Sequence, residues 1–148
     1  KHDVCYFAFY LLNRQNQNAQ YKHIAEQQKY DSEDQFVIWE KPMPQKKLKV
    51  QEWITPCALE QYSFYVPIGA SASKLMATFL KAYKVTGKKL YWAKAIELAN
   101  ITTITQISET GRYPTYWEWK ETGKRKDWIN SACYCSKVML EMANFMGN

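Results

Sequence analysis

The chain has 148 residues, a formal net charge of +6 and a hydrophobic content of 47%. This length favours one domain or a part of one, and the hydrophobic content is enough for a packed core. The sequence holds no run of about 18 apolar residues, so we expect no membrane span. It opens on Lys1-His2-Asp3, without a signal peptide or an initiator Met, and we interpret it as a mature or trimmed fragment.

The few cysteines and histidines argue against a metal or cofactor site. The four cysteines form no CxxC pair, and two histidines are too few to complete a zinc site; the cysteines are Cys5, Cys57, Cys133 and Cys135. The sequence also has no P-loop, no GxGxxG motif and no Ser-His-Asp set. We therefore expect no metal ion and no cofactor.

The first 66 residues give weak signals of secondary structure. Residues 4–13 resemble the tail of a helix, and a second, weaker helix is predicted over 19–29 after a turn. Residues 36–39 are typical of a short strand. Segment 55–66 is ambiguous, because its Thr-Pro start suits one or two short helical turns before a proline breaks them.

The second half of the chain is strongly helical. The spacing of apolar residues predicts helices over 70–86 and 89–106, and Gly87 between them makes an antiparallel hairpin. A third helix is predicted over 130–146. Residues 113–119 have some strand character, although a proline weakens it. The predicted fold class is all-α, built from antiparallel helical hairpins.

A pattern of aromatic and acidic residues occurs twice. Trp39-Glu40 is followed, after a lysine-rich stretch, by Glu52-Trp53, and Trp117-Glu118 is followed, after another basic stretch, by Asp127-Trp128. A helix is predicted after each copy. The pattern therefore indicates one structural unit that is used twice.

The helices repeat as well. Ser73-Lys74-Leu75-Met76 matches Ser136-Lys137-Val138-Met139 at an offset of 63 residues, and Cys5-Tyr6 matches Cys133-Tyr134 at about twice that offset. This spacing is typical of arrays of helical hairpins. Because the hairpin 70–106 turns at 86–89, its two ends lie together, and we predict that all long aromatic loops share one face.

The segments Tyr83-x-x-Thr86-Gly87 and Tyr91-x-x-Lys94-Ala95, with Asp127-Trp128-Ile129-Asn130 before the next helix, resemble the six-hairpin, or (α/α) toroid, glycosidase-like superfamily. The resemblance covers residues 70–146. It implies a ring of hairpins with a carbohydrate across its mouth, and a secreted or periplasmic location. Because a complete toroid needs about twelve helices, 1–148 would be a single helical-hairpin domain, a C-terminal fragment of a larger toroid that is inactive alone.

Sugar hydrolysis needs two carboxylates that flank the scissile bond. The candidates on the loop face are Asp127, Glu52 and Glu118, with Glu40 as a further possibility. Asp127 leads because it stands directly before a predicted helix and beside a tryptophan. The alternative for Asp127 and Glu52 is an N-cap, a common role for a carboxylate at this place.

Aromatic side chains of both loops are candidates to stack on sugar rings, and arginine is suited to bind a uronate carboxylate. The expected substrate-binding residues are Arg112, Tyr113, Tyr116, Trp117, Trp119, Trp128, Trp53 and Trp39. The alternative is that the aromatic rings anchor the loops on helix ends, and that Arg112 is a plain surface charge.

The function that we expect is therefore binding of an anionic polysaccharide or oligosaccharide by a glycoside hydrolase-like or polysaccharide lyase-like protein. The alternative is a non-catalytic helical-repeat module that binds a protein partner. Two basic clusters favour an anionic partner: Lys41, Lys46, Lys47 and Lys49 in one loop and Lys120, Lys124, Arg125 and Lys126 in the other. We expect no nucleic acid, because no zinc-finger, RRM or KH signature is present.

Overall fold

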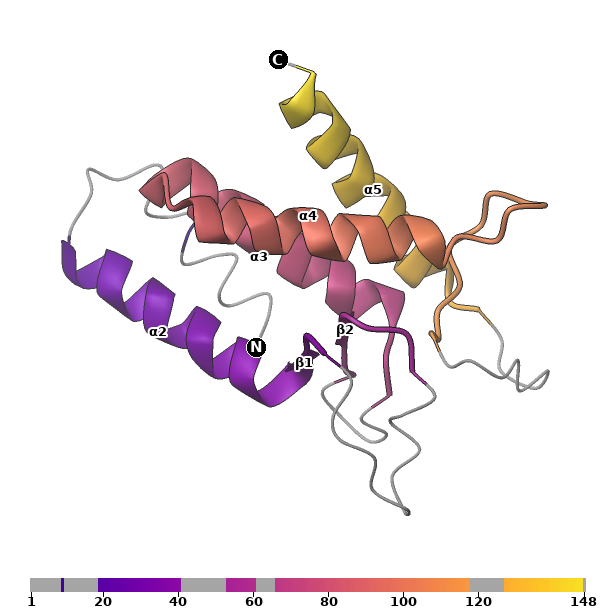
Figure 1. Ribbon diagram of the computed structural model, residues 1–148, viewed down its shortest axis with the longest axis horizontal. Helices are drawn as coiled ribbons and strands as arrows, with labels where there is room; N and C mark the ends of the chain where they lie inside the picture. Colours follow the sequence, from indigo (N-terminus) through magenta and orange to yellow (C-terminus); the bar gives the residue numbers. More distant parts are fainter. Residues whose placement is uncertain (1–8, 10–18, 41–52, 61–65, 118–126, 148) are drawn as a thin grey trace.

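A computed structural model describes residues 9, 19–40, 53–60, 66–117 and 127–147 (Figure 1). These residues are mostly helical, which confirms that the fold is mainly α-helical. The arrangement of the helices in a toroid stays a prediction. The elements are α2 (Ala19–Phe36), β1 (Val37–Ile38), β2 (Cys57–Ala58), α3 (Gly69–Thr86), α4 (Lys89–Ile104) and α5 (Ile129–Met146).

The hairpin of α3 and α4 is the centre of the fold, as predicted. Gly87 ends α3 in the left-handed conformation, with φ of 68°, and its amide donates a 2.8 Å hydrogen bond to the Tyr83 carbonyl. A residue without a Cβ adopts this conformation at little cost, which is why the chain turns here. Most of α3 is buried, including Leu75, Phe79 and Leu80, and α4 covers it along one side (Figure 1).

Helix α5 runs parallel to α3. At the start of both helices, Ser73 Oγ lies 3.0 Å from Cys135 Sγ, and further along both, Lys84 Nζ lies 3.4 Å from a carboxylate oxygen of Glu141. The helices approach closely because Gly69 has no side chain: a Cβ there would lie 3.0 Å from Cys135 Sγ. Glycine at this position therefore sets the distance between α3 and α5.

Helix α2 runs parallel to α4 (Figure 1). Glu26, in the first half of α2, accepts hydrogen bonds from Lys88 Nζ at 2.6 Å and from the Tyr91 hydroxyl at 3.1 Å. Further along both helices, Glu33 is ion-paired with Lys94. The four helices thus form two parallel pairs, α2 with α4 and α3 with α5, and the residues that contact each other within a pair are 57 to 65 positions apart in the sequence.

The described ends of the long loops are tied together by backbone hydrogen bonds. β1 pairs antiparallel with β2, and single bridges join Leu59 to Pro67 and Ile68 to Tyr116. Further bonds run from the amides of Leu59, Ile68, Gly69 and Trp117 to the carbonyls of Phe36, Ala58, Thr115 and Pro67. These segments lie at one end of the helices, opposite the α3–α4 turn, as predicted (Figure 1).

Three details differ from the sequence-based prediction. Helix α2 continues to Phe36 rather than ending near Lys29, because its second half packs against α4 through buried side chains. The helical turns predicted from Thr55 are wrong in the described part of 55–66, where Cys57–Ala58 pairs with β1 instead. Of the predicted strand 113–119, the described part forms only an isolated bridge.

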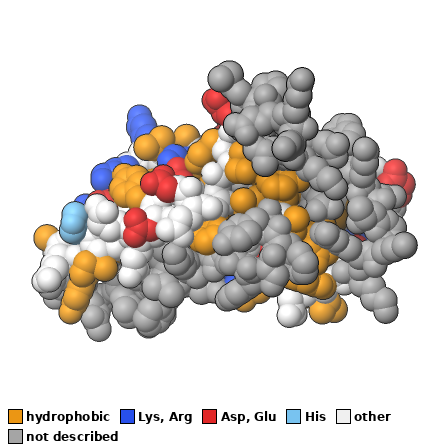
Figure 2. All heavy atoms as spheres, turned by 90° about the horizontal axis from the view of Figure 1, so that it is seen from below, with side chains coloured by type: hydrophobic (Ala, Val, Ile, Leu, Met, Phe, Trp, Pro, Cys, Tyr) orange, Lys and Arg blue, Asp and Glu red, His pale blue; other side chains and the backbone are white. Residues whose placement is uncertain are grey.

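In the view from below in Figure 2, most of the coloured Lys and Arg side chains lie toward the end where α2 begins, and hydrophobic side chains lie among them and across the middle. None of the helices in the described part of the chain has the length and hydrophobicity of a membrane span.

Candidate functional site

The loop before α5 and the first turn of α5 are joined by two reciprocal hydrogen bonds. The Thr115 amide donates to Asp127 Oδ1 at 3.0 Å, and the Trp128 amide donates to Thr115 Oγ1 at 2.6 Å. Thr115 is fully buried, so its own amide and hydroxyl are shielded from bulk water, while Asp127 and Trp128 are partly exposed. We call these two bonds the Thr115 clasp.

The Thr115 clasp presents an aromatic pair to the surface. The rings of Tyr116 and Trp128 meet edge to face, with centroids 5.6 Å apart and an interplanar angle of 69°. Trp128 is 42% exposed, and Tyr116 is half-buried. An exposed indole that is held by a neighbouring ring offers a fixed apolar platform.

A charged pair completes this site. Arg112 Nη2 donates to Asp127 Oδ2 at 3.2 Å, and the Arg112 side chain is 63% exposed. The guanidinium of Arg112 is therefore accessible from solvent. Among the described residues, Asp127 is the carboxylate that binds next to the aromatic pair, and its two oxygens are both engaged.

The N-cap role considered for Asp127 is wrong. Helix α5 begins at Ile129 with Trp128 at the N-cap position, and no side chain caps it by a hydrogen bond. The Asp127 carboxylate instead turns back to the loop 112–115. Its place directly before the helix is therefore used for tertiary contact rather than for capping.

Several of the predicted sugar-binding aromatics pack inward. Trp117 is only 2% exposed and belongs to the core, so it has no face to offer a ligand. Trp53 and Trp39 are half-buried against the same core, and Trp39 Nε1 donates to Glu33 at 2.9 Å. Tyr113 is also half-buried, and burial raises its pKa. Trp117 thus follows the alternative, loop anchoring, whereas Trp39, Trp53 and Tyr113 keep part of their surface exposed.

The remaining predicted residues are either exposed away from the aromatic pair or outside the described part of the chain. Glu40 is exposed at the end of the described segment 19–40. Glu52, Glu118 and Trp119 lie outside the described residues, as do both lysine clusters. The two aromatic copies also differ: α5 follows Trp128 at once, whereas the first copy leads into β2 rather than into a helix.

The sequence analysis missed a buried ionic cluster between α2, α3 and α4. Lys29 is fully buried, with its amine 3.3 Å from the centroid of the Tyr30 ring, 4.6 Å from that of Tyr91 and 3.3 Å from a Glu33 oxygen. Burial lowers the pKa of Lys29, while Glu33 opposes that shift. The sequence signal was the i, i+4 pair of Lys29 and Glu33, which extends α2.

A second polar contact flanks this cluster. Burial alone would raise the pKa of Glu26, but hydrogen bonds from Lys88 and Tyr91 outweigh it, and the pKa lies below its ordinary value. Burial and the neighbouring Tyr30 and Glu26 raise the pKa of the Tyr91 hydroxyl. Both contacts join α2 to α4, so we assign them to packing rather than to a ligand.

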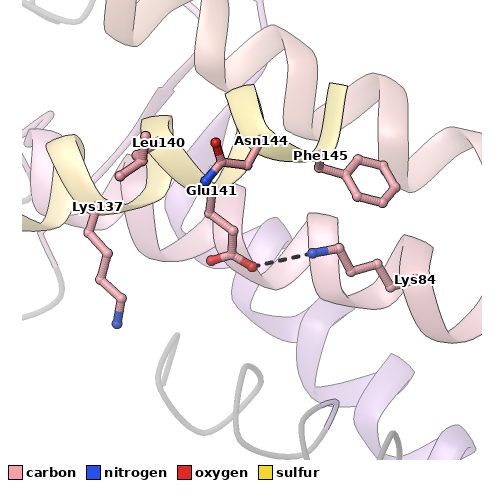
Figure 3. Close-up of a pocket in the computed structure, with 6 residues that line it drawn as sticks. All are labelled: Lys84, Lys137, Leu140, Glu141, Asn144 and Phe145. Carbon is pink, nitrogen blue, oxygen red and sulfur yellow. Dashed lines mark hydrogen bonds and ion pairs between the residues drawn. The ribbon is translucent and has the colours of Figure 1, made fainter. Parts of the chain in front are cut away.

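A shallow groove of about 350 Å³ lies between α5 and the end of α3 (Figure 3). It is lined by Lys84, Lys137, Leu140, Glu141, Asn144 and Phe145. Lys84 points to Glu141, whereas the amine of Lys137 points away from that pair (Figure 3). The groove lies toward the C-terminal ends of α3 and α5, away from the Thr115 clasp at their N-terminal ends.

Within the described part of the chain, no three His, Cys, Asp or Glu side chains are grouped so that they could hold a metal ion. Comparison with family models, with curated proteins and with solved structures finds no match to this chain. The aromatic pair with Arg112 and Asp127 is therefore the candidate site on its geometry alone.

Proposed function

We propose that this chain binds an anionic, uronate-containing glycan at its loop end, as part of a carbohydrate-active (α/α) toroid protein. The observation that carries the proposal is the exposed ring of Trp128, fixed by Tyr116 and by the Thr115 clasp, with the Arg112 guanidinium beside it. An indole face suits the apolar C–H face of a pyranose, and a guanidinium suits its carboxylate.

The arrangement of the helices supports the toroid part of the proposal. Helices α3 and α5 are parallel neighbours, and α2 and α4 are a second parallel pair running the other way. In such a two-layer array, each hairpin adds one helix to each layer and returns the chain to the same end. The gathering of the described loop ends at one end of the helices supports a mouth at that end.

The enzymatic part of the proposal assigns acid or base chemistry to Asp127, with Glu52 or Glu118 as the second carboxylate. Asp127 supports this role by its exposure and by its position beside the aromatic pair. To exchange a proton, its Oδ2 would leave Arg112, and a bound uronate carboxylate would take over the guanidinium.

Binding is tested by titrating the full chain with uronate oligosaccharides and with neutral oligosaccharides of equal length. Trp128→Ala is expected to weaken binding of both by about 3- to 10-fold, the range for one lost aromatic contact. Arg112→Ala is expected to remove the preference for uronates, with Arg112→Lys keeping part of it. Tyr21→Ala, an exposed aromatic near the start of α2, is the matched control.

If neither class of oligosaccharide binds, the proposal is wrong as a whole. Equal binding of both classes would contradict the preference for uronate-containing glycans. Catalysis is tested in the complete protein with Asp127→Asn, which keeps the acceptor for the Thr115 amide and loses the charge. Full turnover by that variant would remove Asp127 from the catalytic assignment.

A further inference from the structure

Helix α5 carries two apolar stripes, and only one of them is used. The first stripe, which faces α3, is buried: Ser131, Cys135, Val138 and Met142. The second stripe, which we call the outer stripe, is Ala132, Ser136, Leu140, Ala143 and Met146. Its members recur every three or four residues and so share one face of the helix. Leu140 is 63% exposed and Met146 is 57% exposed.

The outer stripe repeats the face of α3 on which α5 packs. At an offset of 63 residues, its positions correspond to Gly69, Ser73, Ala77, Leu80 and Tyr83 on α3. Gly69 and Ser73 contact Cys135, and the ring of Tyr83 meets that of Phe145 at 6.0 Å. Ala77 and Leu80 are buried on the same face between these contacts.

One of the five positions of this face is identical in the two copies, Ser73 and Ser136, and the other four differ. Ser136 and Lys137 repeat Ser73 and Lys74 without change, and alanine stands in place of Gly69. Ala77 and Leu80 become Leu140 and Ala143, which exchanges a small and a large residue and conserves their combined volume. Methionine replaces Tyr83, a flexible apolar residue in place of an aromatic one.

The lysines of the repeated Ser-Lys pair, Lys74 and Lys137, also suggest that the two faces make the same kind of contact. The amine of Lys74 lies 5.1 Å from the centroid of the Tyr134 ring, across the α3–α5 interface. The equivalent Lys137 has no hydrogen bond or ion pair with a residue that the structure describes, and it lines the groove beside Leu140 (Figure 3). A cation at the edge of an apolar stripe is suited to an aromatic ring of a partner.

We propose that the outer stripe of α5 is the docking face for a helix of a partner protein, which runs parallel to α5 and continues the α3–α5 interface by one repeat. The partner helix presents the pattern of α5's own buried stripe: small residues at the positions of Ser131 and Cys135, and bulky apolar residues at those of Val138, Met142 and Phe145. An aromatic residue at the position of Tyr134 lies over Lys137.

The angle between the stripes fixes where the partner helix sits. At about 100° per residue, the centres of the buried and outer stripes of α5 lie about 110° apart around the helix axis. The partner helix is therefore not opposite α3, and the row of parallel helices bends at α5 by about 70°.

The test uses a labelled peptide of residues 127–147 in which Leu140→Lys and Met146→Lys leave only the buried stripe apolar. Fluorescence anisotropy with the full chain is expected to show saturable 1:1 binding in the micromolar range. Leu140→Glu in the chain is expected to weaken binding at least about tenfold, because the carboxylate would be buried without a partner. Asn100→Glu, on the exposed side of α4, is the matched control and keeps the parent affinity.

A second peptide that also carries Val138→Glu and Met142→Glu is expected not to bind. The proposal is overturned if the first peptide fails to bind up to about 1 mM, or if it binds the Leu140→Glu chain as well as the parent. Sedimentation of the parent chain provides a separate arm: a dimer that Leu140→Glu abolishes would assign the stripe to a second copy instead. Leu140 is exposed, so circular dichroism of that variant is expected to match the parent. None of these outcomes depends on glycan binding.

Discussion

The Thr115 hydroxyl accepts a 2.6 Å hydrogen bond from the Trp128 backbone amide, and Thr115 is fully buried. One side chain of the loop 112–115 thus satisfies the amide of the N-cap residue, although the helix has no N-cap side-chain hydrogen bond. The same threonine donates its own amide to Asp127, so the position of the carboxylate and that of the indole depend on a single residue.

Thr115→Val should test this dependence, because valine keeps the volume and removes the acceptor. The Trp128 amide would lose its partner, which is expected to lower the free energy of unfolding by about 1–3 kcal/mol in urea titrations. Thr103→Val, at an exposed position of α4, should change it by less than about 0.5 kcal/mol. Equal stability of the two variants would show that α5 begins without help from Thr115.

The buried pair of Lys29 and Glu33 should respond unequally to removal of its two members. Glu33→Gln leaves the Lys29 ammonium buried without an anion and is expected to cost about 3–5 kcal/mol of unfolding free energy. Lys29→Met fills the space with an apolar side chain, and Glu33 keeps Lys94, so the effect is expected to be neutral or stabilising. Thermal unfolding of both variants checks this; a large loss in Lys29→Met would contradict it.

Glu26 should make the fold sensitive to acid. Its pKa in the folded chain lies below the ordinary value of 4.5, so the carboxylate contributes stability above that value. This contribution is lost as the pH falls through the folded-state pKa, because protonation breaks the contacts with Lys88 and Tyr91. Glu26→Gln should show a flatter dependence of unfolding free energy on pH below about 4.5. An unchanged slope in that variant would rule out this contribution.

Replacing Gly69 or Gly87 with alanine is expected to destabilise the fold, for different reasons. A Cβ at Gly69 would lie 3.0 Å from Cys135 Sγ and 3.1 Å from the Pro114 carbonyl. Gly69→Ala is therefore expected to push α3 and α5 apart and to lower the free energy of unfolding by about 1–3 kcal/mol. Gly87→Ala meets no atom within 4 Å, and its cost of about 1–2 kcal/mol is expected from the backbone alone. Urea unfolding measures both losses.

Thiol reactivity distinguishes the effect of Gly69→Ala from that of Gly87→Ala, and it shows which cysteines are buried. Cys133 is exposed, whereas burial raises the pKa of Cys57 to about 12 and also raises that of Cys135. Peptide mapping after alkylation at pH 8 should find Cys133 modified and the two buried thiols protected. In Gly69→Ala, Cys135 is expected to become reactive, while in Gly87→Ala it stays protected. Early modification of Cys57 in the parent would contradict the burial.

The helices with a clear apolar period were predictable from sequence, and the rest of the fold was not. The hairpin at Gly87 and the helix predicted over 130–146 appear within two residues of their expected bounds, since their apolar residues and the stop at Gly87 are local signals. Helix α2 has little amphipathic period, and its second half depends on an ion pair with α4. Strand β2 depends on pairing with β1, which is distant in sequence.

The candidate site was predicted only in part, for a related reason. Trp128, Arg112 and Asp127 were identified from composition and position, and the structure brings them together. Sequence reasoning could not tell Trp128 from Trp117, because both stand in polar surroundings and only the tertiary fold buries Trp117. It also could not tell that the carboxylate of Asp127 turns back to the loop.

The ends of the long loops are joined by amide-to-carbonyl bonds such as those of Trp117 with Pro67 and of Gly69 with Thr115. Such bonds do not depend on which side chains the segments carry, apart from proline at a donor position. Exposed positions between them, such as Arg112, are therefore open to substitution without loss of the scaffold. A surface built in this way can change its charge and shape through single mutations while the helices beneath it stay as they are.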